Sequence, residues 1–207
     1  MITGYVPGPV LAEQPPSAQQ ACRYLQHLHQ QLRKLPQQQS YDLAGLIHGW
    51  MPEPPNWLAS YLRRGSDLQT LAAQPQQCCH NDLNPWNVVV SAEQPDAWTT
   101  LDWETAQQGH PVFDAVCLHQ GLALELVDAS KPSPLDQPRP GWPGLAEFCA
   151  QALGEPVASA LLQAAVRCFW LREYAWAQDQ LRLGNDNPAI AAQRVQAEQQ
   201  LRLHLDA

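Results

Sequence analysis

The stretch Cys79-His80-Asn81-Asp82-Leu83-Asn84-Pro85-Trp86-Asn87 decides how this chain folds. It is a polar loop between two short β-compatible runs, residues 78–80 and residues 88–90. A third such run, residues 98–101, ends directly before Asp102. Short strands that form a hairpin would bring the polar loop and Asp102 together at one end. Loops held by a rigid scaffold often carry a protein's chemistry, so this region is the first candidate for a site.

Asp82, Asn87 and Asp102 form a set of side chains suited to phosphoryl transfer. In that reaction a carboxylate accepts the hydroxyl proton, while an Asn and a second Asp hold magnesium against the nucleotide phosphates. The pattern H-x-D-x-x-x-x-N, followed by a β-compatible run that ends in Asp, has the spacing of the protein-kinase catalytic loop. A plain turn whose side chains cap backbone groups is the alternative, but it does not predict the second acidic strand end.

Two segments, C-H-N-D-L-N-P-W-N-V-V-V and T-L-D-W-E-T-A-x-x-G-H-P-x-F-D, resemble the aminoglycoside phosphotransferase and choline kinase superfamily. The folds of that superfamily are related to protein kinases. Asn81 and the Asp102-Trp103-Glu104 tripeptide are more similar to its choline kinase and thiamine kinase members. The resemblance implies an α+β fold and ATP- and magnesium-dependent phosphorylation of a small-molecule hydroxyl.

The resemblance also implies a role for each residue of the loop region. Asp82 would be the catalytic base, and His80 would belong to the catalytic loop as the residue that braces it. Asn87 and Asp102 would be the magnesium ligands. Asp114 would support the loop from below.

Weaker similarities extend to both ends of the chain. Residues 1–11 look like the family's hinge, in which Gly4 and Tyr5 would meet the adenine. Residues 170–176 are similar to the aromatic helix that lines the acceptor pocket of choline and thiamine kinases. A cage of aromatic and acidic side chains would suit a cationic acceptor such as thiamine, choline, ethanolamine, an amino sugar or an aminoglycoside, although aromatic residues at helical spacing are also typical of a core. The predicted substrate-binding residues are Trp86, Glu104, Trp170, Tyr174 and Trp176.

Length and composition limit the other classes of function. The 207 residues, 45% of them hydrophobic, are enough for one substantial core. A net charge of -8 argues against a partner with a phosphate backbone, so no nucleic acid is expected. The chain shows no apolar run long enough to span a bilayer and no secretory signal pattern, which predicts a cytoplasmic protein without a membrane partner.

The predicted fold is the C-terminal lobe of a protein-kinase-like architecture, mostly helical, with a small β hairpin that carries the catalytic loop. One domain, 1–207, would contain the hinge-like segment 1–11, the catalytic and metal-binding loops 78–114 and the helical acceptor side 143–207. Apolar spacing, capping residues and prolines predict the helices. They are expected from Ser17 to before Pro36, from Trp57 to before Pro75, and over residues 112–127, 145–153, 157–183 and 188–205.

The features of a kinase N-terminal lobe are largely absent from the sequence. The only lysines are Lys34 and Lys131, neither of which can be the β-strand Lys that contacts the phosphates, and no G-x-G-x-x-G occurs. Three explanations remain open: the true start lies upstream, a separate chain supplies that lobe, or the protein is a degenerate relative. The isolated chain is therefore expected to be weakly active or inactive, and the alternative function is that of a non-catalytic binding or regulatory remnant.

Overall fold

The computed structural model describes residues 7–36, 39–91, 97–126 and 141–206. The predicted nucleotide-binding residues Gly4 and Tyr5 lie outside these residues, as do residues 1–6 of the hinge-like segment. Most of the Pro-rich stretch at residues 131–143 also lies outside them.

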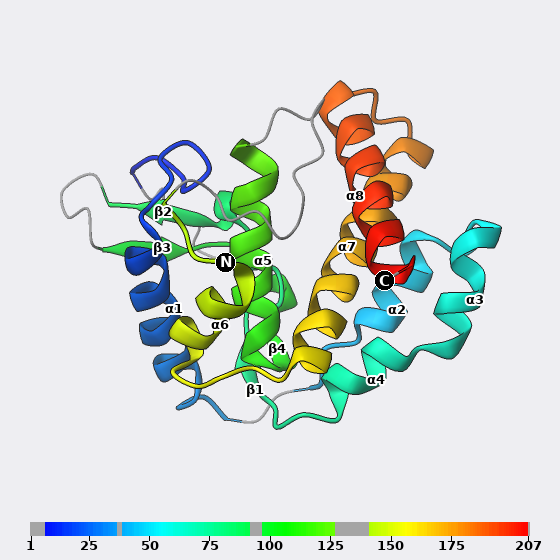
Figure 1. The fold of residues 1–207 in the computed structure, drawn as a ribbon. Helices are drawn as coiled ribbons and strands as arrows, with labels where there is room; N and C mark the ends of the chain where they lie inside the picture. Colours follow the sequence, from blue (N-terminus) through cyan, green and yellow to red (C-terminus); the bar gives the residue numbers. More distant parts are fainter. Residues whose placement is uncertain (1–6, 37–38, 92–96, 127–140, 207) are drawn as a thin grey trace.

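Eight α-helices, four short strands and two single-turn 3-10 helices, Pro85–Asn87 and Trp103–Thr105, form the regular structure of the described part of the chain, which is mostly helical (Figure 1). The helices are α1 (Ala18–Leu32), α2 (Leu43–Trp50), α3 (Asn56–Arg64), α4 (Ser66–Ala72), α5 (Pro111–Leu126), α6 (Leu145–Leu153), α7 (Ser159–Arg182) and α8 (Pro188–Asp206). The strands are β1 (Gln77–Cys79), β2 (Val88–Val90), β3 (Trp98–Thr100) and β4 (Gln107–Gly109). Among the helices that the structure describes, none is long and apolar enough to cross a membrane.

The strands form two antiparallel pairs, and the predicted catalytic loop, residues 80–87, connects one pair to the other. β2 pairs with β3, with Val89 opposite Thr99, and this pair is the expected hairpin. β1 pairs with β4, with Cys78 opposite Gln108, a pairing that the sequence did not predict. Asp82 and Asn87 lie between β1 and β2, and Asp102 lies between β3 and β4. The loops that carry the three residues therefore emerge from neighbouring strand ends.

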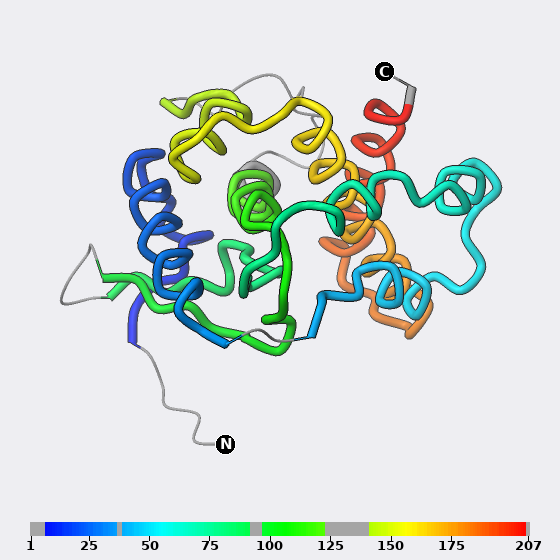
Figure 2. Tube along the Cα trace, turned by 90° about the horizontal axis from the view of Figure 1, so that it is seen from below, coloured from blue at the N-terminus to red at the C-terminus, as the bar shows by residue number. Residues whose placement is uncertain are grey.

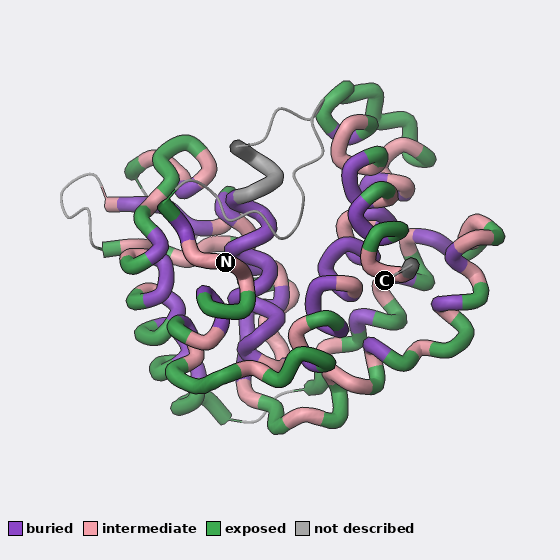
Figure 3. The backbone as a smooth tube through the Cα atoms, in the orientation of Figure 1, coloured by how far each residue is buried: buried purple, intermediate pink, exposed green. Residues whose placement is uncertain are grey.

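Helix α5 is the centre of the core. Seen from below in Figure 2, it lies between α1 and α6 on one side and α7 on the other. Helix α6 packs against both α1 and α5, and α7 packs against α5, α2, α4 and α8. Residues from Pro111 to Leu122 are buried, so α5 is surrounded by protein and does not present a polar face to water. Figure 3 shows buried residues along α5 and α7.

Local sequence signals explain most helix boundaries. Ser17 caps α1 and forms a capping box with Gln20, as its position before the apolar repeat predicted. The single helix expected after Trp57 is instead two helices, because Gly65 takes a left-handed conformation with φ 58° between α3 and α4. Helix α2 was not predicted, and its cap is Asp42, whose side chain accepts the N–H of Gly45.

Candidate active site

A left-handed turn at Asn81 begins the catalytic loop. Asn81 has φ 63°, and Asn tolerates this region better than most residues. The fully buried carboxylate of Asp114, from the first turn of α5, accepts the backbone N–H of His80 at 3.0 Å and that of Asn81 at 2.7 Å. His29 of α1 contacts the same carboxylate at 3.1 Å. Asp114 thus contacts the backbone of the loop from the first turn of α5.

Electrostatics favour an ionised Asp114. Burial alone would raise the pKa of this carboxyl, but the hydrogen bond and charge of His29, together with the N–H of His80, lower the pKa below its ordinary value. A buried carboxylate that stays charged can hold several N–H donors at once. The turn at Asn81 is therefore fixed by a charge on the core side.

His80 links the two loops of the site. Its Nδ1 accepts the backbone N–H of Asp82 at 3.3 Å, which leaves the proton on Nε2. Nε2 donates to the carbonyl of Leu101 at 2.8 Å, and Leu101 directly precedes Asp102. The imidazole is completely buried and lies 4.9 Å from the ring of Trp103, centroid to centroid. These contacts are those of a bracing residue.

Asp82 points into a cavity, and its carboxylate is held on both sides. Asn84 Nδ2 donates to Oδ1 at 3.3 Å, and Asn87 Nδ2 donates to Oδ2 at 3.3 Å. Asn87 Nδ2 also donates to the backbone carbonyl of Asp82 at 3.0 Å. Both bonds use the Nδ2 of Asn87, so neither of them occupies its Oδ1.

Asp102 adopts a left-handed conformation, with φ 56° and ψ 63°. A non-glycine residue in this region is uncommon and often marks a functional position. Asp102 is exposed and borders the same cavity as Asp82 and Asn87. The carboxylate of Asp102 and the amide oxygen of Asn87 are hard oxygen ligands, the kind that magnesium prefers. The residues present therefore fit a magnesium ion.

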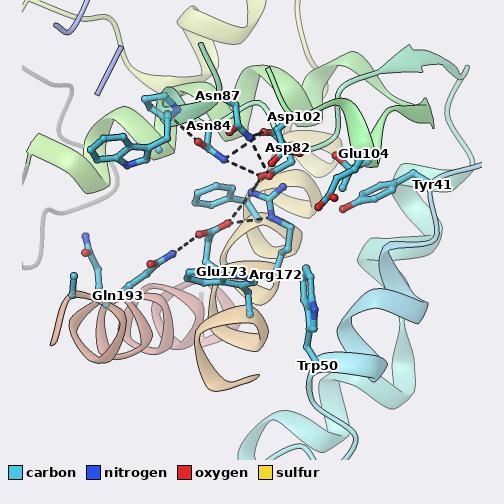
Figure 4. Close-up of a pocket in the computed structure, with 18 of the residues that line it drawn as sticks. Tyr41, Trp50, Asp82, Asn84, Asn87, Asp102, Glu104, Arg172, Glu173 and Gln193 are labelled. Carbon is cyan, nitrogen blue, oxygen red and sulfur yellow. Dashed lines mark hydrogen bonds and ion pairs between the residues drawn. The ribbon is translucent and has the colours of Figure 1, made fainter. Parts of the chain in front are cut away.

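The cavity has a volume of about 570 Å³ and lies between the catalytic loop and helices α7 and α8 (Figure 4). Of the five predicted substrate-binding residues, Trp86, Glu104 and Trp176 line it. Three aromatic residues that the sequence did not single out, Tyr41, Trp50 and Phe169, also line it. Burial raises the pKa of Tyr41 to about 12, so its hydroxyl is neutral at physiological pH.

Trp170 and Tyr174 do not line the cavity, which differs from what the sequence suggested. Both are buried in the core, and Tyr174 packs edge-on against Trp57 of α3 with 5.7 Å between ring centroids. The reason is helical geometry, because 100° per residue turns these two positions away from the face of α7 that carries Arg172 and Trp176.

The structure also places a buried ion-pair group beside Asp82. Arg172 of α7 lies 3.2 Å from Asp82 Oδ1 and 2.7 Å from Glu173 Oε1, each measured from its guanidinium. Glu173 in turn accepts a hydrogen bond at 2.7 Å from Gln193 of α8. Sequence reasoning missed Arg172, because nothing in a helical stretch indicates that one of its residues contacts a loop about 90 residues away in the chain. Only the fold brings the two together.

Comparisons with known proteins agree with this geometry. A family model described as the phosphotransferase enzyme family matches residues 1–148. A search of curated proteins gave no match. Among solved structures, the chain is similar to a choline/ethanolamine kinase family protein from Mesorhizobium loti, with 17% identity, a TM-score of 0.62, and coverage of 99% of this chain and 71% of that one.

Two further structures share the fold. Choline kinase LicA from Streptococcus pneumoniae has 16% identity and a TM-score of 0.59, with 90% of this chain and 63% of that chain covered. The GDP complex of aminoglycoside 2'-phosphotransferase-IIIa has 14% identity and a TM-score of 0.58, with 96% and 69% covered. The chain thus spans about two thirds of the length of these structures. The predicted kinase-related α+β fold is confirmed, whereas a separate chain supplying an N-terminal lobe finds no support.

Proposed function

The chain belongs to the phosphotransferase enzyme family, and we propose that it transfers a phosphoryl group from ATP to the hydroxyl of a small cationic molecule. The observation that carries this proposal is the convergence of Asp82, Asn87 and Asp102 on one cavity. Asp82 would accept the proton of the acceptor hydroxyl and position its oxygen for attack on the terminal phosphorus. His80 would act through the backbone that it braces.

Magnesium would be held by Asn87 and Asp102. When bound, the ion neutralises charge on the nucleotide phosphates and orients them. The residues of this chain contribute by position: the left-handed backbone at Asp102 directs its carboxylate to the cavity, and the two bonds of Asn87 to Asp82 fix the amide. Nucleotide use is supported by the family and by the GDP complex of the aminoglycoside enzyme. Gly4 and Tyr5 stay predicted contacts of the adenine.

The walls of the cavity favour a cation as acceptor. Trp50, Trp86 and Trp176 surround the space in which a quaternary ammonium or thiazolium group would lie, and an aromatic face attracts such a cation. The acidic residues Asp82, Asp102, Glu104 and Glu173 outnumber the basic residues among those that line the cavity. Choline, ethanolamine, thiamine and an aminoglycoside are the candidates.

A cytoplasmic location fits the cysteine chemistry. All six cysteines are buried free thiols, and their arrangement is typical of a reducing compartment.

Residues 1–207 would act as one unit, with the phosphate chemistry at residues 78–114 and the acceptor side at residues 143–207.

The test is turnover with Mg-ATP and each candidate acceptor, measured as ADP release and as phosphorylated product by mass spectrometry. The chain is assayed alone and in a form extended upstream. The turnover rate of the variant Asp82→Asn is expected to be about 10²–10⁴-fold lower than that of the wild-type chain, while the variant still binds the acceptor. Asp179→Asn, which removes a carboxylate of α7 that pairs with Arg182 outside the cavity, is the control and should retain activity.

Binding of an acceptor without turnover in either form would support the regulatory remnant instead. Turnover that persists undiminished in Asp82→Asn would exclude Asp82 as the base.

A further inference from the structure

Arg172 is built into the core of the protein although it carries a permanent charge. Only 4% of the residue is exposed, and its guanidinium carbon lies 5.5 Å from the ring centroids of both Phe113 and Phe169. Burial alone would lower the pKa of this group, but its neighbours, including the carboxylates of Asp82 and Glu173, hold the pKa above its ordinary value. A buried cation of this kind is costly unless its donors are used.

Its donors are used on the catalytic loop and on α7. One terminal nitrogen donates to the carbonyl of Asn81 at 2.7 Å, and the other contacts Asp82 Oδ1 at 3.2 Å. Nε and that second nitrogen also bond to Glu173 Oε1, at 3.1 and 2.7 Å. Figure 4 shows the guanidinium between the carboxylates of Asp82 and Glu173.

The left-handed turn is thereby held from two opposite sides. Asp114 accepts the N–H groups of His80 and Asn81 on the core side, and Arg172 donates to the carbonyl of Asn81 on the cavity side. Residues in this backbone region persist only when the surroundings determine them. An anion that takes the N–H groups and a cation that takes the C=O group provide this restraint.

We propose that Arg172 is a positioning residue for the catalytic carboxylate, an inference that rests on the proposed function. By contacting both the backbone before Asp82 and its Oδ1, Arg172 fixes where the carboxylate stands and how it is rotated. The planar guanidinium suits this task because it presents several donors in a fixed geometry. Glu173, anchored by Gln193 of α8, keeps the guanidinium in place.

A comparison within α7 separates this role from simple stabilisation. Arg167 is on the same helix and makes a bidentate bond to Asp67, at 2.7 and 3.0 Å. That pair joins α7 to α4 and is not part of the cavity wall. Loss of Arg167 therefore removes an equivalent ion pair of the same helix without touching the loop.

The experiment compares Arg172→Met, Arg172→Lys and Arg167→Met. They are made in whichever form of the protein shows turnover, the chain alone or the form extended upstream. Methionine keeps much of the side-chain volume and removes the charge. We expect Arg172→Met to lower kcat at least about 30-fold while the KM for ATP changes little, because misplacement of a reacting group affects the chemical step. Arg172→Lys should recover part of kcat, and Arg167→Met should lose thermal stability but keep kcat.

Hydrogen exchange of the peptide that spans residues 80–87 is measured in parallel, since it needs no turnover. Exchange should be at least about tenfold faster in Arg172→Met than in Arg167→Met, because the loop opens locally. If exchange in this peptide is the same in the two variants, or if their kcat values agree within threefold, the inference is wrong.

A failure of the proposed function gives a different result from a failure of this inference. In that case the wild-type chain shows no turnover in any form, and the exchange comparison alone decides whether Arg172 positions the loop.

Discussion

His80 Nε2 lies 2.8 Å from the carbonyl oxygen of Leu101, so a completely buried imidazole connects the loop of Asp82 to the residue before Asp102. The proposed general base and one of the proposed metal ligands belong to different strand ends. This hydrogen bond links the two loops, together with the bond from the Leu101 N–H to the carbonyl of Asn87 at 2.8 Å and the bond from Thr105 Oγ1 to the carbonyl of His80 at 2.8 Å.

Replacing His80 with Leu makes the position apolar and removes both bonds of the ring. We expect weaker binding of Mn²⁺, used as a probe for magnesium, by about tenfold, because one of the hydrogen bonds that hold the residue before Asp102 is lost. Electron paramagnetic resonance of free Mn²⁺ measures this. His110→Leu is the control, since it removes a similar bond to the N–H of Val112 outside the cavity, and equal Mn²⁺ affinity in the two variants would contradict the expectation.

Asp114→Asn should lower the free energy of unfolding by about 3–5 kcal/mol, because the backbone N–H groups of His80 and Asn81 lose a buried carboxylate acceptor. Its effect depends on pH. The pKa of Asp114 is lowered in the folded state, so its stabilisation is complete above the unfolded pKa of about 3.9 and is lost as pH falls below that value. Urea denaturation from pH 6 to 3 should therefore give a flatter pH dependence for the variant, and parallel curves would count against the assignment.

Substitutions of the two tryptophans of α7 should differ in their effect on acceptor binding. Trp170→Phe removes a buried Nε1–H that has no hydrogen-bond partner in the described structure, so stability should change by less than about 1.5 kcal/mol and acceptor binding should stay the same. Trp176→Ala should raise the KM for a cationic acceptor about tenfold, as the loss of a cation–π contact predicts. Thermal unfolding and steady-state kinetics on both variants test this, and a raised KM in Trp170→Phe would refute it.

Gly121 in α5 allows the catalytic loop to approach closely. A Cβ at this position would lie 2.6 Å from Cδ of Pro85, a ring that cannot move without the loop backbone. Gly121→Ala should therefore destabilise the protein by about 1–2 kcal/mol in spite of the better helix propensity of Ala. Gly49→Ala, which meets nothing within 4 Å, is the matched control and should stabilise by about 0.5–1 kcal/mol in the same urea titration.

Much of the fold could be predicted because its signals are local. The helix that begins after Ser17 and the short strand runs around Asp82 are encoded in apolar spacing, caps and β-branched residues over a few positions. The pairing of β1 with β4 could not be predicted, because β4 is Gln107–Gly109, which has no β-forming residue and is selected by tertiary contacts. Helix α2 is short and glycine-containing, which weakens its local signal.

The candidate site divides in the same way. Asp82, Asn87 and Asp102 follow a motif of fixed spacing, so the chain itself indicates them. Arg172, Tyr41 and Trp50 join the cavity only through packing, and no spacing rule connects them with the loop. For the aromatic residues of α7, residue type alone does not predict which of them line the cavity, because the rotation of the buried helix decides this.

The two walls of the cavity come from separate parts of the chain. One wall is the loop region that ends at Thr105, and the other includes Ala189, Ala192, Gln193 and Gln196 of α8. Evolution can therefore change the ligand by substituting the second wall while the first stays as it is. Saturation mutagenesis restricted to Ala189, Ala192 and Gln196 leaves the bond of Gln193 to Glu173 intact and would be an efficient way to redirect the protein to a new acceptor.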